Sequence, residues 1–209
     1  MTPESFAGRH PSLWRISAEG SAEGIRRHGL LTAAQIAALT GLPPFTAPRR
    51  RAVRATLPDG TAVAITDNAP LSFARLAPVL DDGLRPADWL GMLDGRVFFW
   101  VRREAGEANL RARRKLGYRS EWHRFDTLAL LAPVWDRVEI AAINTGATVH
   151  QPPRRGRATF APLAGLDYEA WRERRRTAGV KKGLDSVQEV TVRDGVPHAG
   201  AALREVIAA

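Results

Sequence analysis

The side chains that could do chemistry in this sequence are few in kind. The chain has no cysteine, which excludes disulfides, thiolate metal sites and a cysteine nucleophile. Its five histidines are scattered without the spacing of metal ligands, so a metal site is not expected: His10, His28, His123, His150 and His198. A Walker-type phosphate loop, a G-x-G-x-x-G turn and a G-x-S-x-G elbow are all missing. Arginine in large excess and a few isolated carboxylates remain.

The net charge is strongly positive. Lysine and arginine number 31 against 22 aspartates and glutamates, for a net charge of +9, and arginine supplies nearly all of it. Such a chain is attracted to polyanions, including nucleic acid, acidic lipid and phosphate-bearing cofactors. A GC-rich genome produces the same richness in arginine and alanine, so charge alone leaves nucleic-acid contact open.

Two predicted strands place polar side chains where they could act together. Residues 13–17 alternate in polarity and predict a short strand, which puts Arg15 and Ser17 on one face because they are two positions apart. Residues 186–192 alternate and are rich in β-branched side chains, so they predict a late strand. Glu189 stands near its start, and Gln188 points to the opposite face.

The remaining pattern predicts short strands interspersed with helices. A hairpin is expected from residues 49–57 and 61–65 around Pro58-Asp59-Gly60, and 97–101 reads as a central, buried strand. Further strands are expected over 122–125 and 137–143, and a mobile segment over 179–183. Helices are expected over 25–28, 33–39, 71–80, 85–92, 104–116, 126–131, 168–177 and 199–209.

These elements predict one α+β domain over residues 1–209, with a mixed or antiparallel split sheet and peripheral helices. The long crossover helices of a doubly wound sheet are missing. No apolar run is long enough to span a membrane, and residues 1–10 lack a signal-peptide pattern, so a cytoplasmic location is the expected default.

Two stretches resemble the opening of ADP-ribosyltransferase folds: Leu13-Trp14-Arg15-Ile16-Ser17 and Ile25-Arg26-Arg27-His28-Gly29-Leu30-Leu31-Thr32. In those folds a first strand with a Tyr-His-x-Thr motif precedes a helix ending in His/Asn-Gly-Leu, and the resemblance is to the DarT-type enzymes. Nearly the whole chain is also similar to a bacterial family of unknown function, of the DUF7002 type. The segments that carry this similarity are 65–72, 83–89, 96–100, 125–127, 143–146, 153–156, 159–160 and 188–197.

The ADP-ribosyltransferase resemblance implies NAD as a substrate. Cleavage of the nicotinamide–ribose bond passes through an oxocarbenium-like state, which a carboxylate beside the ribose stabilises. The resemblance assigns that catalytic role to Glu189. It implies that Arg15 contacts the pyrophosphate and Ser17 a ribose hydroxyl, although these enzymes often have histidine and threonine there. An Arg/Ser pair occurs in another branch of ADP-ribosyltransferases.

The resemblance also implies further contacts with NAD. Phe99 or Trp100 is expected to sandwich the nicotinamide ring, and Gly29 and Asn144 complete the expected cofactor set. From their own chemistry, the arginine clusters are expected to hold phosphates of either NAD or a nucleic-acid target. The residues expected to bind substrate are Arg51, Asp67, Arg154 and Arg155.

The function expected from these observations is NAD-dependent mono-ADP-ribosyl transfer, with nucleic acid, DNA or RNA, as the favoured acceptor. One alternative is an NAD-dependent RNA 2′-phosphotransferase, which uses a spread of basic residues and does not depend on one glutamate. A second is a non-catalytic module that grips nucleic acid through its arginines, with salt-sensitive affinity. A third is a small partner-binding protein such as an antitoxin or a scaffold.

Overall fold

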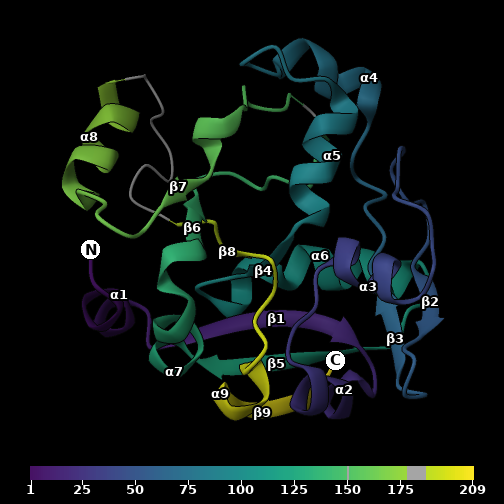
Figure 1. Ribbon diagram of the computed structural model, residues 1–209. Helices are drawn as coiled ribbons and strands as arrows, with labels where there is room; N and C mark the ends of the chain where they lie inside the picture. The colour runs from purple at the N-terminus through teal and green to yellow at the C-terminus, as the bar shows by residue number, and fades with distance from the viewer. Residues whose placement is uncertain (150, 178–186) are drawn as a thin grey trace.

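The protein has an α+β architecture, as its sequence predicts, built on two antiparallel sheets with helices around them (Figure 1). The computed structural model describes residues 1–149, 151–177 and 187–209. The first sheet has the strand order β1-β5-β9, with β1 at Ser12–Ala18, β5 at Ser120–Asp126 and β9 at Leu203–Ala208. In Figure 1 its strands cross the lower part of the molecule.

The second sheet carries the late strand on which Glu189 lies. Its order is β4-β8-β6-β7, with β4 at Arg96–Phe99, β8 at Glu189–Arg193, β6 at Val138–Ala141 and β7 at Ala161–Pro162. A separate hairpin pairs β2 (Val53–Thr56) with β3 (Ala62–Ile65), as predicted from the turn at Pro58-Asp59-Gly60. It stands at the right of Figure 1.

Helices and 3₁₀ turns connect and cover these strands. The α-helices are α1 (Pro3–Arg9), α2 (Ser21–His28), α3 (Ala33–Leu39), α4 (Phe73–Leu76), α5 (Pro86–Asp94), α6 (Arg103–Lys115), α7 (Thr127–Leu131), α8 (Tyr168–Thr177) and α9 (Ala199–Ala202). The 3₁₀ turns are η1 (Ala77–Val79), η2 (Ala132–Arg137) and η3 (Arg157–Thr159). Helix α3 has the bounds predicted, 33–39, and it begins after Thr32 because Thr32 and Gln35 form a reciprocal capping box.

The two sheets are joined at one point, between β1 and β4. Trp14 and Trp100 exchange two backbone hydrogen bonds, both 2.8 Å long, just beyond the end of β4. This junction brings Arg15 next to β4, where its Nη1 donates to the carbonyl oxygen of Phe98 at 2.9 Å. The fold therefore places the first strand beside the sheet that carries Glu189.

The second sheet has one apolar and one polar face. Val97, Phe99, Ile140 and Val190 lie in the largest apolar core, which extends to the first sheet and α7. The opposite face presents Arg96, Phe98, Glu139, Glu189 and Thr191, whose positions follow from the pairing register of β4, β8 and β6. Helix α5 packs on this side through Trp89, Leu90 and Leu93, against Ala141 and Phe98. Charged groups are thus held within a buried layer.

Two predictions about elements are wrong. The 97–101 strand is not central: β4 is an edge strand, and β8 lies between β4 and β6. Its run is apolar throughout because α5 and the junction with β1 cover its second face. The 199–209 segment is helical only to Ala202, since Leu203–Ala208 pairs with the edge of β5 and that pairing overrides the helix propensity of its alanines. The helix predicted over 71–80 is present over Phe73–Val79, and it changes from α4 to the 3₁₀ turn η1 after Leu76 because Pro78 cannot donate a backbone hydrogen bond.

Other predicted elements agree with the structure, apart from their ends. Helix α2 begins at Ser21, ahead of the predicted 25–28, and β6 ends at Ala141, ahead of the predicted 143. The mobile segment predicted over 179–183 lies outside the described residues. Within the part of the chain that the structure describes, no helix is both long and apolar enough to cross a membrane.

Candidate functional site

A cavity of about 220 Å³ lies where the two sheets meet. Strands β1, β4 and β8 contribute walls, together with α3, α6, the end of α5 and the segment that follows β3. Arg15, Asp67, Trp100, Asn144 and Glu189, five of the residues predicted as site residues, all line it. Its other lining residues include Arg49, Asn68, Asp94, Arg96, Phe98, Asn109, Arg113 and Thr145.

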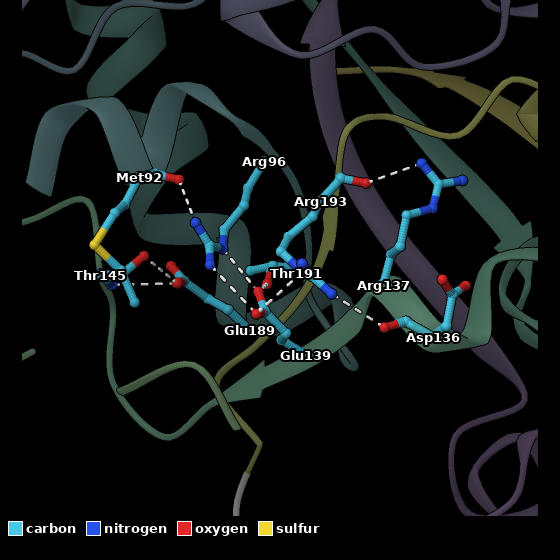
Figure 2. Close-up of polar contacts among 9 residues, drawn as sticks. All are labelled: Met92, Arg96, Asp136, Arg137, Glu139, Thr145, Glu189, Thr191 and Arg193. Atoms are coloured by element: carbon cyan, nitrogen blue, oxygen red, sulfur yellow. Dashed lines mark hydrogen bonds and ion pairs between the residues drawn. The ribbon is translucent and has the colours of Figure 1, made fainter. Parts of the chain in front are cut away.

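Glu189 is a buried carboxylate at the first position of β8. Its Oε2 accepts hydrogen bonds from the hydroxyl of Thr145 at 2.6 Å and from the Thr145 backbone N–H at 3.2 Å (Figure 2). Burial raises the pKa of Glu189 to about 7, although the Thr145 hydrogen bonds and the positive charge of Arg155 oppose the rise. A carboxyl group with this pKa can accept or release a proton near neutral pH.

Arg155 anchors the cavity wall that contacts Glu189. The side chain is 1 % exposed, and its Nη1 donates to the carbonyl oxygens of Thr145 at 3.0 Å and Ala147 at 3.1 Å. Its Nε donates to the carbonyl oxygen of Pro153 at 3.2 Å, and its guanidinium lies over the ring of Trp89. The indole N–H of Trp89 also donates to the Thr145 carbonyl. Thr145 is therefore fixed from behind while it faces Glu189.

Arg15 is the cavity arginine that retains unused hydrogen-bond donors. Its Nη1 is bound to Phe98, but its Nε is buried without a hydrogen-bond partner, and no described carboxylate forms an ion pair with it. Burial, together with the charge of Arg113, lowers the pKa of Arg15 to about 10, so it stays protonated at neutral pH. A buried guanidinium without a carboxylate partner is suited to bind an anion.

The other cavity arginines are paired. Arg49 makes two hydrogen bonds of 2.7 Å to Asp94, and Arg113 lies 3.8 Å from Asp67. Arg96 donates to Glu139 at 2.8 Å. Figure 2 shows Glu139 between Arg96 and Arg193, which lies 3.4 Å from the same carboxylate. Each of these cavity arginines therefore has a carboxylate partner, whereas Arg15 has none among the described residues.

One aromatic wall of the cavity is backed by α6. Trp100 and Phe98 line the cavity, and the Trp100 ring packs edge-on against Trp122, with 5.9 Å between ring centroids. Gly106 of α6 permits this approach, because a Cβ there would lie 2.5 Å from the Trp122 ring and 3.0 Å from the Trp100 ring. Trp100 is thus held by packing, as a ring-binding surface requires.

Three predicted cofactor residues lie away from the cavity. Ser17 is buried in the first sheet, directly opposite Glu121 of β5. Phe99 is 1 % exposed in the main core, on the face of β4 opposite to Phe98. Gly29 ends α2 with φ of +72° and packs against the backbone of Val196 and Pro197. Each has a structural environment of its own, and none is among the cavity lining.

The four residues predicted to bind substrate also differ in whether they line the cavity. Asp67 lines the cavity, whereas Arg155 lies behind its wall. Arg154 is exposed and forms an ion pair with Asp81, and Arg51 is exposed beside β2. Neither Arg154 nor Arg51 lines the cavity.

Sequence reasoning missed several residues of the site. Thr145 stands in an Asn-Thr-Gly stretch that reads as an ordinary turn, and its contact with Glu189 spans 44 positions. Arg113 and Asn109 are four positions apart in α6, a spacing that marks one helix face and was the available signal. The Arg49–Asp94 ion pair joins residues 45 positions apart, so no local sequence pattern predicts it. Among the described residues, no group of three or more metal-ligating side chains is present.

Comparisons with other proteins place the chain in a family without assigning an activity. No curated protein and no solved structure matches it. Residues 11–203 match a family described as a family of unknown function, DUF7002. The match covers nearly the whole chain and includes every residue that lines the cavity. The chain therefore belongs to the DUF7002 family.

Proposed function

We propose that the protein is an NAD-dependent ADP-ribosyltransferase whose reaction takes place in the cavity between the two sheets. The observation that carries the proposal is that Arg15 of β1 and Glu189 of β8, 174 positions apart, line the same cavity. Their segments are the two to which the ADP-ribosyltransferase resemblance gives functional roles. Trp100 and Asn144, expected to contact NAD, line that cavity as well.

The charged groups of the cavity suit two parts of NAD, its pyrophosphate and its nicotinamide ribose. Arg15 offers buried, unused donors to a phosphate oxygen of NAD. Glu189, when ionised, stabilises the positive charge that develops on the ribose as the bond to nicotinamide breaks. Trp100 offers a ring face against which nicotinamide can stack.

The proposed reaction breaks the bond between ribose C1′ and the nicotinamide nitrogen. The electron pair of that bond leaves with nicotinamide, and an acceptor oxygen or nitrogen forms a new bond to C1′. The acceptor loses its proton in this step, and Glu189 is the buried base available to take it. Because the pKa of Glu189 is raised to about 7, transfer is expected to increase as pH rises through 7.

Nicotinamide release from NAD tests the proposal. We expect release by the wild-type protein in the presence of a nucleic-acid acceptor, and its loss in Glu189→Gln and Arg15→Met. Glu121→Gln is a matched control, because Glu121 is also a buried strand carboxylate but lies outside the cavity, paired with His123. Failure of the wild-type protein to release nicotinamide with DNA, RNA or cell lysate would overturn the proposal.

The RNA 2′-phosphotransferase alternative is separated by the same variants. That reaction relies on basic residues, so Glu189→Gln should leave phosphate removal largely intact while Arg15→Met abolishes it. Retention of NAD-dependent 2′-phosphate removal by Glu189→Gln would favour this alternative over ADP-ribosyl transfer.

A further inference from the structure

We propose that a basic surface beside the cavity binds the phosphate backbone of a nucleic acid. The surface consists of five cationic side chains from two segments, the last turns of α6 and the region around the start of β2: Arg51, Arg54, Arg111, Arg114 and Lys115. The inference rests on the proposed function only in making this polymer the acceptor, since binding itself requires no NAD.

The positive charge of this surface is not neutralised by the protein. All five side chains belong to exposed residues, and among the described residues none of the five forms an ion pair. No aspartate or glutamate occurs within residues 49–58 or 108–120. Exposed arginines elsewhere do form ion pairs with carboxylates: Arg27 pairs with Asp59, and Arg154 with Asp81. The basic surface therefore carries five charges available to an external anion.

The two segments form one surface because a hydrogen bond ties them together. The hydroxyl of Tyr118, just after α6, accepts from the backbone N–H of Ala52 at 2.9 Å. The guanidinium of Arg113 lies over the Tyr118 ring, 5.1 Å from its centroid. Figure 1 agrees, since α6 runs behind α3 toward the hairpin of β2 and β3.

The basic surface borders the cavity at both segments. Arg54 stands directly opposite Ala64 in the hairpin, and Ala64 lines the cavity. On α6, Arg114 follows Arg113, which lines the cavity together with Asn109. A polymer held on this surface would therefore present a nucleotide near the cavity mouth.

The composition of the surface favours nucleic acid over other polyanions. Four of its five cations are arginines, whose planar forks bind phosphate oxygens in pairs. A membrane-binding surface combines basic residues with several apolar anchors, whereas here Leu116 is the exposed large apolar side chain within the α6 segment. Repeated phosphates along a strand match charges that are distributed over two elements.

Fluorescence anisotropy with labelled single-stranded DNA, single-stranded RNA and duplex DNA, without NAD, tests the inference. We expect binding that weakens steeply with salt for at least one of these probes. Arg111→Gln/Lys115→Gln and Arg51→Gln/Arg54→Gln should each weaken binding about tenfold. Each should also reduce the slope of log K against log salt, by about 0.9 per lost phosphate contact for duplex DNA and about 0.7 for a single strand. Arg75→Gln/Arg157→Gln is the control, because it removes two exposed, unpaired charges from α4 and η3.

Three outcomes would overturn the inference: no binding to any probe, equal weakening by the control pair, or tighter binding to phosphatidylserine vesicles than to every oligonucleotide. Nicotinamide release is measured separately. A protein that binds the probes but never releases nicotinamide would refute the proposed transferase and leave this surface established. Release that is insensitive to both pairs of substitutions would show that the acceptor binds elsewhere.

Discussion

At the residue scale, Glu189 combines burial with a position at the edge of a cavity. Folding disfavours its ionised form, because the unfolded carboxyl titrates near 4.5 and the folded one near 7. The free energy of unfolding is therefore expected to fall as pH rises from about 4.5 to 7. Buried carboxyl groups with strongly shifted pKa values cluster at functional sites, where acid–base chemistry uses them.

Glu189→Gln should remove this pH dependence. Relative to wild type, the variant should gain stability between pH 5 and pH 8, by on the order of 3 kcal/mol, because one pKa unit corresponds to about 1.4 kcal/mol. Urea unfolding at both pH values measures the difference. A stability difference between the two proteins that does not change with pH would contradict the assigned protonation.

Arg155 and Arg154 are adjacent in sequence, but we expect only Arg155 to contribute strongly to stability. Arg155→Met removes the guanidinium donor from the carbonyl oxygens of Thr145 and Ala147 and leaves the Trp89 indole as the donor to Thr145, so we expect a loss of about 2 kcal/mol. Loss of this positive charge should also raise the pKa of Glu189 further. Arg154→Met removes only an exposed ion pair and should change stability by less than about 1 kcal/mol.

Urea unfolding and the pH profile of nicotinamide release compare these two variants. Equal destabilisation by both would show that Arg155 does not anchor the wall. An unchanged pH profile in Arg155→Met would show that its charge does not act on Glu189.

The sequence predicted the residues of the site unevenly, for a physical reason. Strand alternation identified Arg15, and the start of a strand identified Glu189, because these are local properties. Ser17 lies on the same strand as Arg15 but is buried opposite Glu121, whereas Arg15 reaches β4 and the cavity. The contact between β1 and β4 cannot be read from alternation. The partners of Arg155 are backbone carbonyl oxygens within residues 145–153. Hydrogen bonds to the backbone do not depend on side-chain type, so no sequence pattern predicts them.

At the element scale, the starts of some helices and the hairpin turn were predictable, whereas several element lengths and the sheet order were not. Thr32 and Asp126 mark the starts of α3 and α7, and the Pro-Asp-Gly turn marks the hairpin. The position of β8 between β4 and β6 depends on contacts across the whole chain. Strand β9 was missed because its identity comes from the open edge of β5 rather than from its own composition.

Helix α6 illustrates how an element supports the site, and it gives a prediction. Gly106→Ala should destabilise the protein by about 1–2 kcal/mol despite alanine's helix propensity, because its Cβ would press on Trp122 and Trp100. Gly91→Ala in α5 is the matched control. Nothing lies within 4 Å of a Cβ at Gly91, so this substitution should stabilise by up to about 1 kcal/mol. Thermal unfolding distinguishes the two, and stabilisation by both would contradict the close packing at α6.

At the scale of the whole molecule, the cavity lies where the two sheets meet, and arginines lie both in its lining and on the surface beside it. Paired arginines line the cavity, Arg15 is left without a carboxylate, and the unpaired basic surface lies beside the cavity. The proposed function divides these charges between NAD inside and a polyanionic acceptor outside. The net charge given by the sequence did not distinguish arginines that would bind NAD from arginines that would bind the acceptor.

The most direct test of the central claim is calorimetric titration of the protein with NAD. We expect one saturable site, with binding lost in Arg15→Met and retained in Arg75→Gln/Arg157→Gln, which leaves the cavity unchanged. Absence of NAD binding by the wild-type protein, or an affinity that Arg15→Met does not alter, would contradict the claim that this cavity is the NAD site.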